Sequence, residues 1–326
     1  MLSHSAAPHL RESHRSFYQS GGVLLCMIPL TVFPCLYYGI RPLLLVLCGM
    51  LAAMLTELLC SAFAGRRPRL VDGSAAVTGA LIGAMMSPMV PFWMPIVGSA
   101  FAIGVAKMPF GGNGRNVFNA AAAGAAFCAI CFPTRMFVYP DPAQSTSLPL
   151  FDTSAVITAV SPMEQLRSGG STSVGWLSLL SGDFPGPIGS VGVLILLASA
   201  LYLFSRHSAS LLILTPYLTT CAIIAAVFPR ASVGVGVSVQ LELCTGLLLF
   251  CGVFLLCDSV TAPRYWLARV VYGILAGILV MVLRWYGRFE SCEFFAVLLV
   301  NSFSPLLDRY CWSFMRQLRR KGGTRV

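Results

Sequence analysis

The feature that most constrains this chain is a succession of ten apolar runs separated by short polar loops. A helix needs about 20 apolar residues to cross a bilayer, and it satisfies its backbone hydrogen bonds internally. Only 10% of the residues are charged. The sequence therefore predicts an all-α polytopic membrane protein with about ten transmembrane helices, at residues 22–40, 43–64, 74–90, 92–108, 117–138, 188–205, 209–228, 240–258, 265–284 and 290–307.

The third run is short and passes into Ser87-Pro88-Met89-Val90-Pro91. This pattern predicts a broken or re-entrant helix. Such a segment is tolerated at membrane depth where protein encloses it, often beside a binding site.

The basic residues indicate how the chain is oriented. The net charge is +10, but most lysines and arginines fall in alternate short loops, as in the positive-inside pattern, and form no basic face for nucleic acid. Both termini are predicted to be cytoplasmic and to leave the long loop 139–187 outside. Membrane lipid is the expected surrounding, and a bacterial inner membrane the expected location.

Five runs precede the long loop and five follow it, so the two halves enter the membrane from opposite sides. Inverted repeats of this kind place binding sites at their interface. Thr78-Gly79 in the third run is similar to Thr245-Gly246 in the eighth. The predicted organisation is a cytoplasmic segment 1–21, a first five-helix repeat 22–138, an outer loop 139–187, a second five-helix repeat 188–308 and a basic cytoplasmic tail 309–326.

A glycine-rich turn, Pro109-Phe110-Gly111-Gly112-Asn113-Gly114-Arg115, leads into Asn116-Val117-Phe118-Asn119. Glycine adopts positive φ and lets a ligand approach the backbone closely. Asn116 and Asn119 would share one face of the following helix. The turn is consistent with a ligand site and equally with a tight turn that ends in a helix N-cap.

Among the acidic residues in or at the ends of apolar runs, three stand out as candidates: Glu57, Asp258 and Asp308. An ionisable group at this depth is a functional-site hypothesis by default. Asp258 and Asp308 could instead pair with bases at the membrane surface. Glu57 has apolar neighbours on both sides, which favours a functional role.

The 12 cysteines fall almost entirely in apolar runs and there act as small apolar residues. Cys128 and Cys131 have CxxC spacing, but one such pair supplies two ligands. A metal site would need a second protein chain, so no metal is predicted for this chain alone.

Several stretches resemble one known family. They are Val71-Asp72-Gly73-Ser74-Ala75-Ala76-Val77-Thr78-Gly79, the turn at 110–121, the segment 258–263, Phe295-Ala296-Val297-Leu298-Leu299-Val300-Asn301 and Pro305-Leu306-Leu307-Asp308. In this order, over about 20–310, they resemble the RnfD/NqrB family, the membrane flavoprotein subunits of the ion-translocating Rnf and Nqr complexes. The short N-terminus is more similar to RnfD.

The resemblance implies FMN bound through a phosphoester to a Thr in a Ser-Gly-Ala-Thr-Pro-Leu-like motif on the outer side. The matching stretch is Thr158-Ala159-Val160-Ser161-Pro162-Met163, which places Ser161 at the attachment position. Serine replaces threonine there, Val160 replaces the small alanine, and Ala155 replaces an upstream aspartate. The family also implies a second, non-covalent flavin such as riboflavin near Asn116, Asn119 and Asp258.

The expected function is a membrane flavin-carrying subunit that passes electrons between flavins in a complex linking ferredoxin and NAD to Na⁺ or H⁺ transport. Partners would be the A-, B-, C-, E- and G-type Rnf subunits and a flavin transferase. Glu57 and Asp308 are candidates for the ion path. Alternatives are an NqrB-type subunit of a Na⁺-translocating NADH:quinone reductase, a non-redox inverted-repeat transporter or channel, and a diverged member without covalent flavin.

Overall fold

The computed structural model describes residues 10–65, 72–112, 114–143, 147–151, 153, 155–168, 174–206, 208–230 and 234–322, with side chains described from 20 to 317 within these ranges. Residues 1–9 of the predicted cytoplasmic segment and 323–326 of the predicted tail lie outside the described residues. So do Val71, Asn113, Asp152 and Ser154.

In the first half of the chain, each predicted apolar run contains a helix. In order they are α1 (Leu10–Val32) with the short α2 (Cys35–Tyr38), α3 (Arg41–Phe63), α4 (Ser74–Ala84), α5 (Trp93–Phe101) continuing as the π-helix η2 (Ala102–Lys107), and α6 (Ala120–Cys131) followed by α7 (Pro133–Met136).

The second half does the same after the long loop. Its helices are α10 (Val193–Ser205), α11 (Leu211–Val227), α12 (Val235–Cys244), α13 (Leu248–Phe250) with the π-helix η4 (Cys251–Leu256), α14 (Trp266–Tyr286) and α15 (Glu293–Gly322). The last helix continues beyond residue 307, so the predicted boundary between the second repeat and the basic tail falls inside α15.

The long loop has structure of its own. It holds β1 (Tyr139–Pro140), β2 (Thr158–Ala159), α8 (Pro162–Arg167) and α9 (Trp176–Ser181), and the 3₁₀ turn η3 (Ile188–Ser190) follows directly after it. The two short strands pair antiparallel, with Tyr139 opposite Ala159. This small sheet is the one departure among the described residues from the all-α prediction.

Broken helices occur where backbone must leave the helical pattern. The predicted third run ends as a helix at Ala84 and continues as turns. In the eighth run α12 and the α13–η4 segment meet at an angle of 58°. Gly246 lies in this break with φ +67°, a conformation that other residues rarely adopt. A broken segment thus occurs in each half. The break in the third run matches the sequence prediction, and the break in the eighth run was not predicted.

Three segments of the described residues are long and apolar enough to cross a membrane unaided: 20–38, Arg41–Phe63 and Trp266–Tyr286. The bent pair would add a fourth, and five shorter apolar helices accompany them. Many large apolar side chains face outward, among them Leu51, Leu55 and Leu59 on α3. The fold is consistent with a polytopic membrane protein, and the count of ten crossings stays a prediction.

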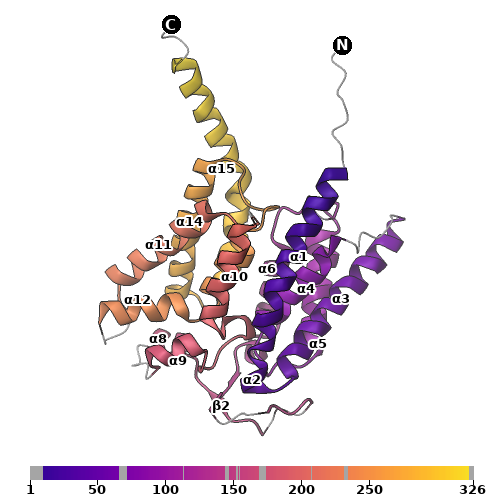
Figure 1. Ribbon diagram of the computed structural model, residues 1–326, viewed down its shortest axis with the longest axis vertical. Helices are drawn as coiled ribbons and strands as arrows, with labels where there is room; N and C mark the ends of the chain where they lie inside the picture. Colours follow the sequence, from indigo (N-terminus) through magenta and orange to yellow (C-terminus); the bar gives the residue numbers. More distant parts are fainter. Residues whose placement is uncertain are drawn as a thin grey trace.

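The two ends of the molecule carry different parts of the chain (Figure 1). The start of α1 and the end of α15 lie at one end, whereas β2, α8 and α9 lie at the opposite end. This arrangement is compatible with the predicted topology, and the orientation in the membrane stays a prediction.

Helix α4 is largely buried and contacts α1, α3, α5 and α6. Its approach to α3 depends on two glycines. A Cβ at Gly79 would lie 2.2 Å from the carbonyl oxygen of Gly49, and one at Gly49 would lie 2.6 Å from the carbonyl oxygen of Gly79. Small residues that allow such contact are the usual basis of helix packing in membranes.

Gly79→Ala is therefore expected to lower the free energy of unfolding in detergent by about 2 kcal/mol or more, because the added methyl meets backbone that cannot rotate away. Gly21→Ala is the matched control, since nothing lies within 4 Å of a Cβ at Gly21. Thermal unfolding of the two variants checks this. Equal midpoints would contradict the close packing of α3 and α4.

Candidate functional site

A cavity of about 130 Å³ lies where the two halves of the chain meet. It is lined from the first half by α1, α4, η2 and the turn before α6, and from the second half by the loop after α10, η4 and the segment 257–260. Asn116, Asn119 and Asp258 all line it. The structure thus brings together three residues that the sequence predicted to share a site.

Asn119 holds the start of α6. Its Oδ1 accepts a hydrogen bond from the Ala122 amide at 3.1 Å, and its Nδ2 donates to the carbonyl of Leu255 in η4 at 3.3 Å. The N-cap interpretation of the turn is confirmed. The expectation that both asparagines share a helix face is wrong, because this cap starts the helix at Ala120 and leaves Asn116 in the preceding loop.

The glycine-rich turn adopts the predicted backbone conformation, with positive φ at Gly111, Gly112 and Gly114. The side-chain Nδ2 of Asn116 donates to the backbone carbonyl of Phe118 at 3.0 Å. Asp258 accepts from the Val260 amide at 3.2 Å and from Thr261 Oγ1 at 3.4 Å. The side-chain oxygens of Asn116 and Asp258 can each accept more than one hydrogen bond. The cavity wall also has an apolar part, which includes Phe254.

Glu57 is ion-paired. Its Oε2 lies 2.9 Å from Lys107 Nζ, and both side chains are buried. Lys107 also donates to Ser74 Oγ at 2.7 Å, and both Lys107 and Ser74 line the cavity. The sequence alone does not link Lys107 to Glu57, because 50 residues separate them. The position of Lys107 inside the fourth apolar run was the signal available.

Asp308 lies within α15 and reaches the start of α14. Its carboxylate accepts from the backbone amides of Arg264, at 3.0 and 3.1 Å, and of Tyr265, at 3.3 Å. These bonds to Arg264 involve its backbone and not its guanidinium. This geometry ties α15 to the two residues that lead into α14, which begins at Trp266, and a role in an ion path stays a prediction.

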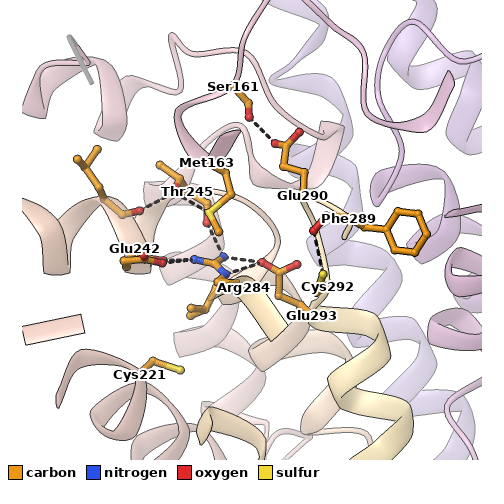
Figure 2. A network of polar contacts seen from close by, with 12 residues as sticks. Ser161, Met163, Cys221, Glu242, Thr245, Arg284, Phe289, Glu290, Cys292 and Glu293 are labelled. Atoms are coloured by element: carbon orange, nitrogen blue, oxygen red, sulfur yellow. Dashed lines mark hydrogen bonds and ion pairs between the residues drawn. The ribbon is translucent and has the colours of Figure 1, made fainter. Parts of the chain in front are cut away.

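Ser161 does not line the cavity. It begins α8, at the end of the bundle opposite to the end of α15 (Figure 1). Its hydroxyl accepts from the Glu164 amide at 3.1 Å and donates to Glu290, in the loop before α15 (Figure 2). Ser161 is 3% exposed and Glu290 is 7% exposed. Burial raises the pKa of Glu290 to about 8, although the hydrogen bond from Ser161 acts in the opposite direction.

A buried charge network lies beside this contact (Figure 2). Arg284 is held between Glu242, at 3.0 Å, and Glu293, at 2.5 Å. Arg230 pairs with the other oxygen of Glu242. The sequence analysis did not select any of these four residues. Acids within the predicted runs 240–258 and 290–307 were the overlooked signal.

The two cysteines of the CxxC pair differ in environment. Cys128 is buried beside the carbonyl of Met94, whereas Cys131 is exposed. Among the described residues, no group of three or more metal-ligating side chains occurs.

Arg284→Ala should lower the free energy of unfolding by about 3 kcal/mol or more, because it leaves two glutamates buried with too little counter-charge. Arg288→Ala, at an exposed position close by, should change it by less than about 0.5 kcal/mol. Thermal unfolding in detergent compares them. A similar small effect of both variants would show that the network contributes little.

Comparison with known proteins agrees with the resemblance noted from the sequence. The profile described as "NQR2, RnfD, RnfE family" matches residues 3–314. The chain is 30% identical over 313 residues to the D-type subunit of the "Na(+)-translocating ferredoxin:NAD(+) oxidoreductase complex" of Acetobacterium woodii, covering 95% of this chain and 93% of that protein.

Two further relatives carry related names. The chain is 29% identical over 331 residues to the D-type subunit of the "Ion-translocating oxidoreductase complex" of Halorhodospira halophila, covering 94% of this chain and 92% of the relative. It is 26% identical over 312 residues to the D-type subunit of the "Proton-translocating ferredoxin:NAD(+) oxidoreductase complex" of Clostridium ljungdahlii, covering 94% and 93%. Matched over nearly its whole length, the chain belongs to the NQR2, RnfD, RnfE family.

Proposed function

We propose that this protein is the D-type membrane subunit of an Rnf-type ion-translocating ferredoxin:NAD oxidoreductase complex and carries flavin for electron transfer. Similarity over nearly the whole length to proteins named as D-type subunits of such complexes supports this. The names of those relatives assign Na⁺ to one and protons to another, so either ion is compatible with the proposal. Ferredoxin and NAD would bind to other subunits.

The observation that carries the flavin proposal is the convergence of Asn116, Asn119 and Asp258 on one cavity between the two halves. An isoalloxazine edge presents alternating donors and acceptors, which amide and carboxylate groups complement. A cavity of about 130 Å³ is smaller than sites that enclose a whole drug-sized ligand. It therefore suits the polar edge of a ring whose remainder extends outside.

Each of these side chains would have a distinct role. Asn119 is engaged by backbone on both sides and would position the turn. Asn116 and Asp258 retain acceptor capacity and would contact a bound riboflavin-type ring. Bound flavin supplies one- and two-electron redox chemistry, and the protein orients it and tunes its electronics. Lys107, which lines the cavity, and its partner Glu57 would fix a charge pair close to the ring.

The paired arrangement of the halves agrees with an inverted repeat. Helix α3 packs against α4 and α5, and α11 packs against α12 and α14. Helix α5 contacts α6 as α14 contacts α15. We propose that these correspond as two repeats of five spans, with the cavity at their interface. Within this frame Glu57 and Asp308 are the proposed ion-path residues.

Covalent FMN at Ser161 is the second part of the cofactor proposal. In the described conformation the Ser161 hydroxyl is buried and engaged by Glu290 and the Glu164 amide. A phosphoester there would set a negative charge against a carboxyl group. The residues as arranged do not fit the phosphoester, which favours a diverged member with non-covalent flavin unless α8 moves.

Asn116→Ala is expected to lower the flavin that denatured protein releases by about fivefold, the effect of losing roughly one hydrogen bond. Val117→Ala, at the adjacent exposed position, is the control and should retain flavin. Fluorescence of the supernatant, normalised to protein, makes the measurement. If the native protein releases no flavin and carries none covalently, the redox proposal fails and a non-redox transporter becomes the better interpretation.

In-gel flavin fluorescence after denaturation tests the covalent cofactor. The protein is co-expressed with a flavin transferase as the native chain, Ser161→Ala and Ser161→Thr. A fluorescent band in the native chain and in Ser161→Thr that is absent from Ser161→Ala is expected if FMN is attached. A dark band throughout would reject attachment and leave only the non-covalent site.

A further inference from the structure

The contact between Ser161 and Glu290 fastens α8 to the loop that joins α14 to α15, as Figure 2 shows. A second bond lies beside it, from Arg167 Nη1 to the carbonyl of Arg288 at 2.8 Å. Met163 on α8 also meets Thr245 at the helix break. Because Ser161 is buried in this docked state, no modifying enzyme can reach its hydroxyl until α8 lifts.

Glu290 differs from the neighbouring glutamates because no arginine in the described part of the chain pairs with it. Arg230 and Arg284 supply two positive charges, and Glu242 and Glu293 supply two negative charges that these arginines pair with. Among the described residues, no salt bridge reaches Glu290. An ionised Glu290 would therefore add an uncompensated negative charge to a buried site, at a cost that a carboxylic acid avoids by holding a proton.

The groups that face Glu290 reinforce this. Glu164 and Glu293 both disfavour its ionised form, and Arg284, the nearby cation that favours it, is already paired. Arg167 pairs with Glu164 at 3.6 Å.

Two further titratable groups lie near this site, Tyr139 on β1 and Cys292 just before α15. Burial raises the pKa of Cys292 to about 11, and burial together with Glu290 raises that of Tyr139. Both side chains are therefore neutral around pH 8 and supply no positive charge. Arg284 is thus the one cation of the described network that favours ionised Glu290, and its charge is shared with two other carboxylates.

We propose that a proton on Glu290 holds α8 against the α14–α15 loop, and that loss of this proton releases α8 and exposes the hydroxyl of Ser161. Glu290 is thus a proton-binding site that positions Ser161. The inference rests on the proposed function at one point: the docked arrangement of Ser161 does not fit a phosphoester, and the released state would present its hydroxyl to a flavin transferase. The release itself concerns only this chain and needs no flavin.

The raised pKa of Glu290 determines how the docking of α8 depends on pH. Burial raises the pKa of Glu290 to about 8, far above the value near 4.3 of an exposed glutamate. Between these values the docked state binds one proton more than the released state, so docking weakens as pH rises. The stabilisation of docking by this proton is fully present below about pH 4, decreases progressively between about pH 4 and about pH 8, and does not change further at higher pH.

Cysteine labelling measures the release without flavin. Ser161→Cys and the control Ser168→Cys, which lies at the exposed end of the same helix, are treated with a membrane-impermeant maleimide in the full chain. The unsubstituted chain corrects for native cysteines. The ratio of the two labelling rates should rise about tenfold between about pH 6.5 and about pH 9, since the control removes the intrinsic pH dependence of a thiol.

Glu290→Gln should hold this ratio low and independent of pH, because a neutral amide cannot lose its proton in this range. The same rise in Glu290→Gln, or a flat ratio in the native background, would overturn the proposal. Hydrogen exchange of the Glu164 amide, which Ser161 caps, gives a second readout in the chain with Ser161 intact. Its protection factor, the ratio of the intrinsic to the observed exchange rate, should fall over the same interval. If no flavin fluorescence appears in the gel but the labelling ratio of Ser161→Cys to Ser168→Cys still rises with pH, flavin attachment at Ser161 is rejected. The proposal that Glu290 binds the proton that holds α8 is then still supported.

Discussion

The structure depends on two buried arginines that satisfy backbone carbonyls where helices break. Carbonyls freed by a helix break inside a membrane need internal partners, because no water can replace the lost bonds. Arg41 donates to the carbonyls of Pro88 and Val90 in the turns after α4. Arg284 donates to those of Glu242 and Thr245 in the break after α12. The two breaks are thereby stabilised, one in each half of the chain.

The two helix breaks lie away from the cavity between the halves, and the second of them lies beside the contact between Ser161 and Glu290. Each half has a short central element, α4 in the first and η4 in the second, and both line the cavity. The arginine-filled breaks lie away from it, and α8 docks beside the second of them. Asn119 joins the two halves at the cavity, since it caps α6 and bonds to Leu255.

The sequence predicted much of this because apolar runs and glycine-rich turns are local signals. Each predicted run contains a helix, and Asn119 serves as the N-cap that the turn allowed. The partners of buried charges could not be predicted in this way, because they come from distant parts of the chain. Glu57 was selected without Lys107, and Arg284 was not selected although Glu242 and Glu293 lay within predicted runs. The docking of Ser161 onto Glu290 had no local signal, since 129 residues separate the two.

The polar residues of α15 show where the fold is rigid. Glu293 bonds to Arg284, Asn301 accepts from Tyr272 Oη at 2.6 Å, and Asp308 accepts from the backbone amides of the two residues just before α14. All three contacts are with α14 or the residues that begin it, and they span about 22 Å of helix at about 1.5 Å per residue. Because apolar contact alone provides little drive for association in lipid, polar contacts at three depths lock α14 and α15 into one hairpin. At the outer end, α8 is attached to this hairpin by the hydrogen bonds of Ser161 and Arg167, while Leu166 packs with Leu179, Phe184 and Leu241.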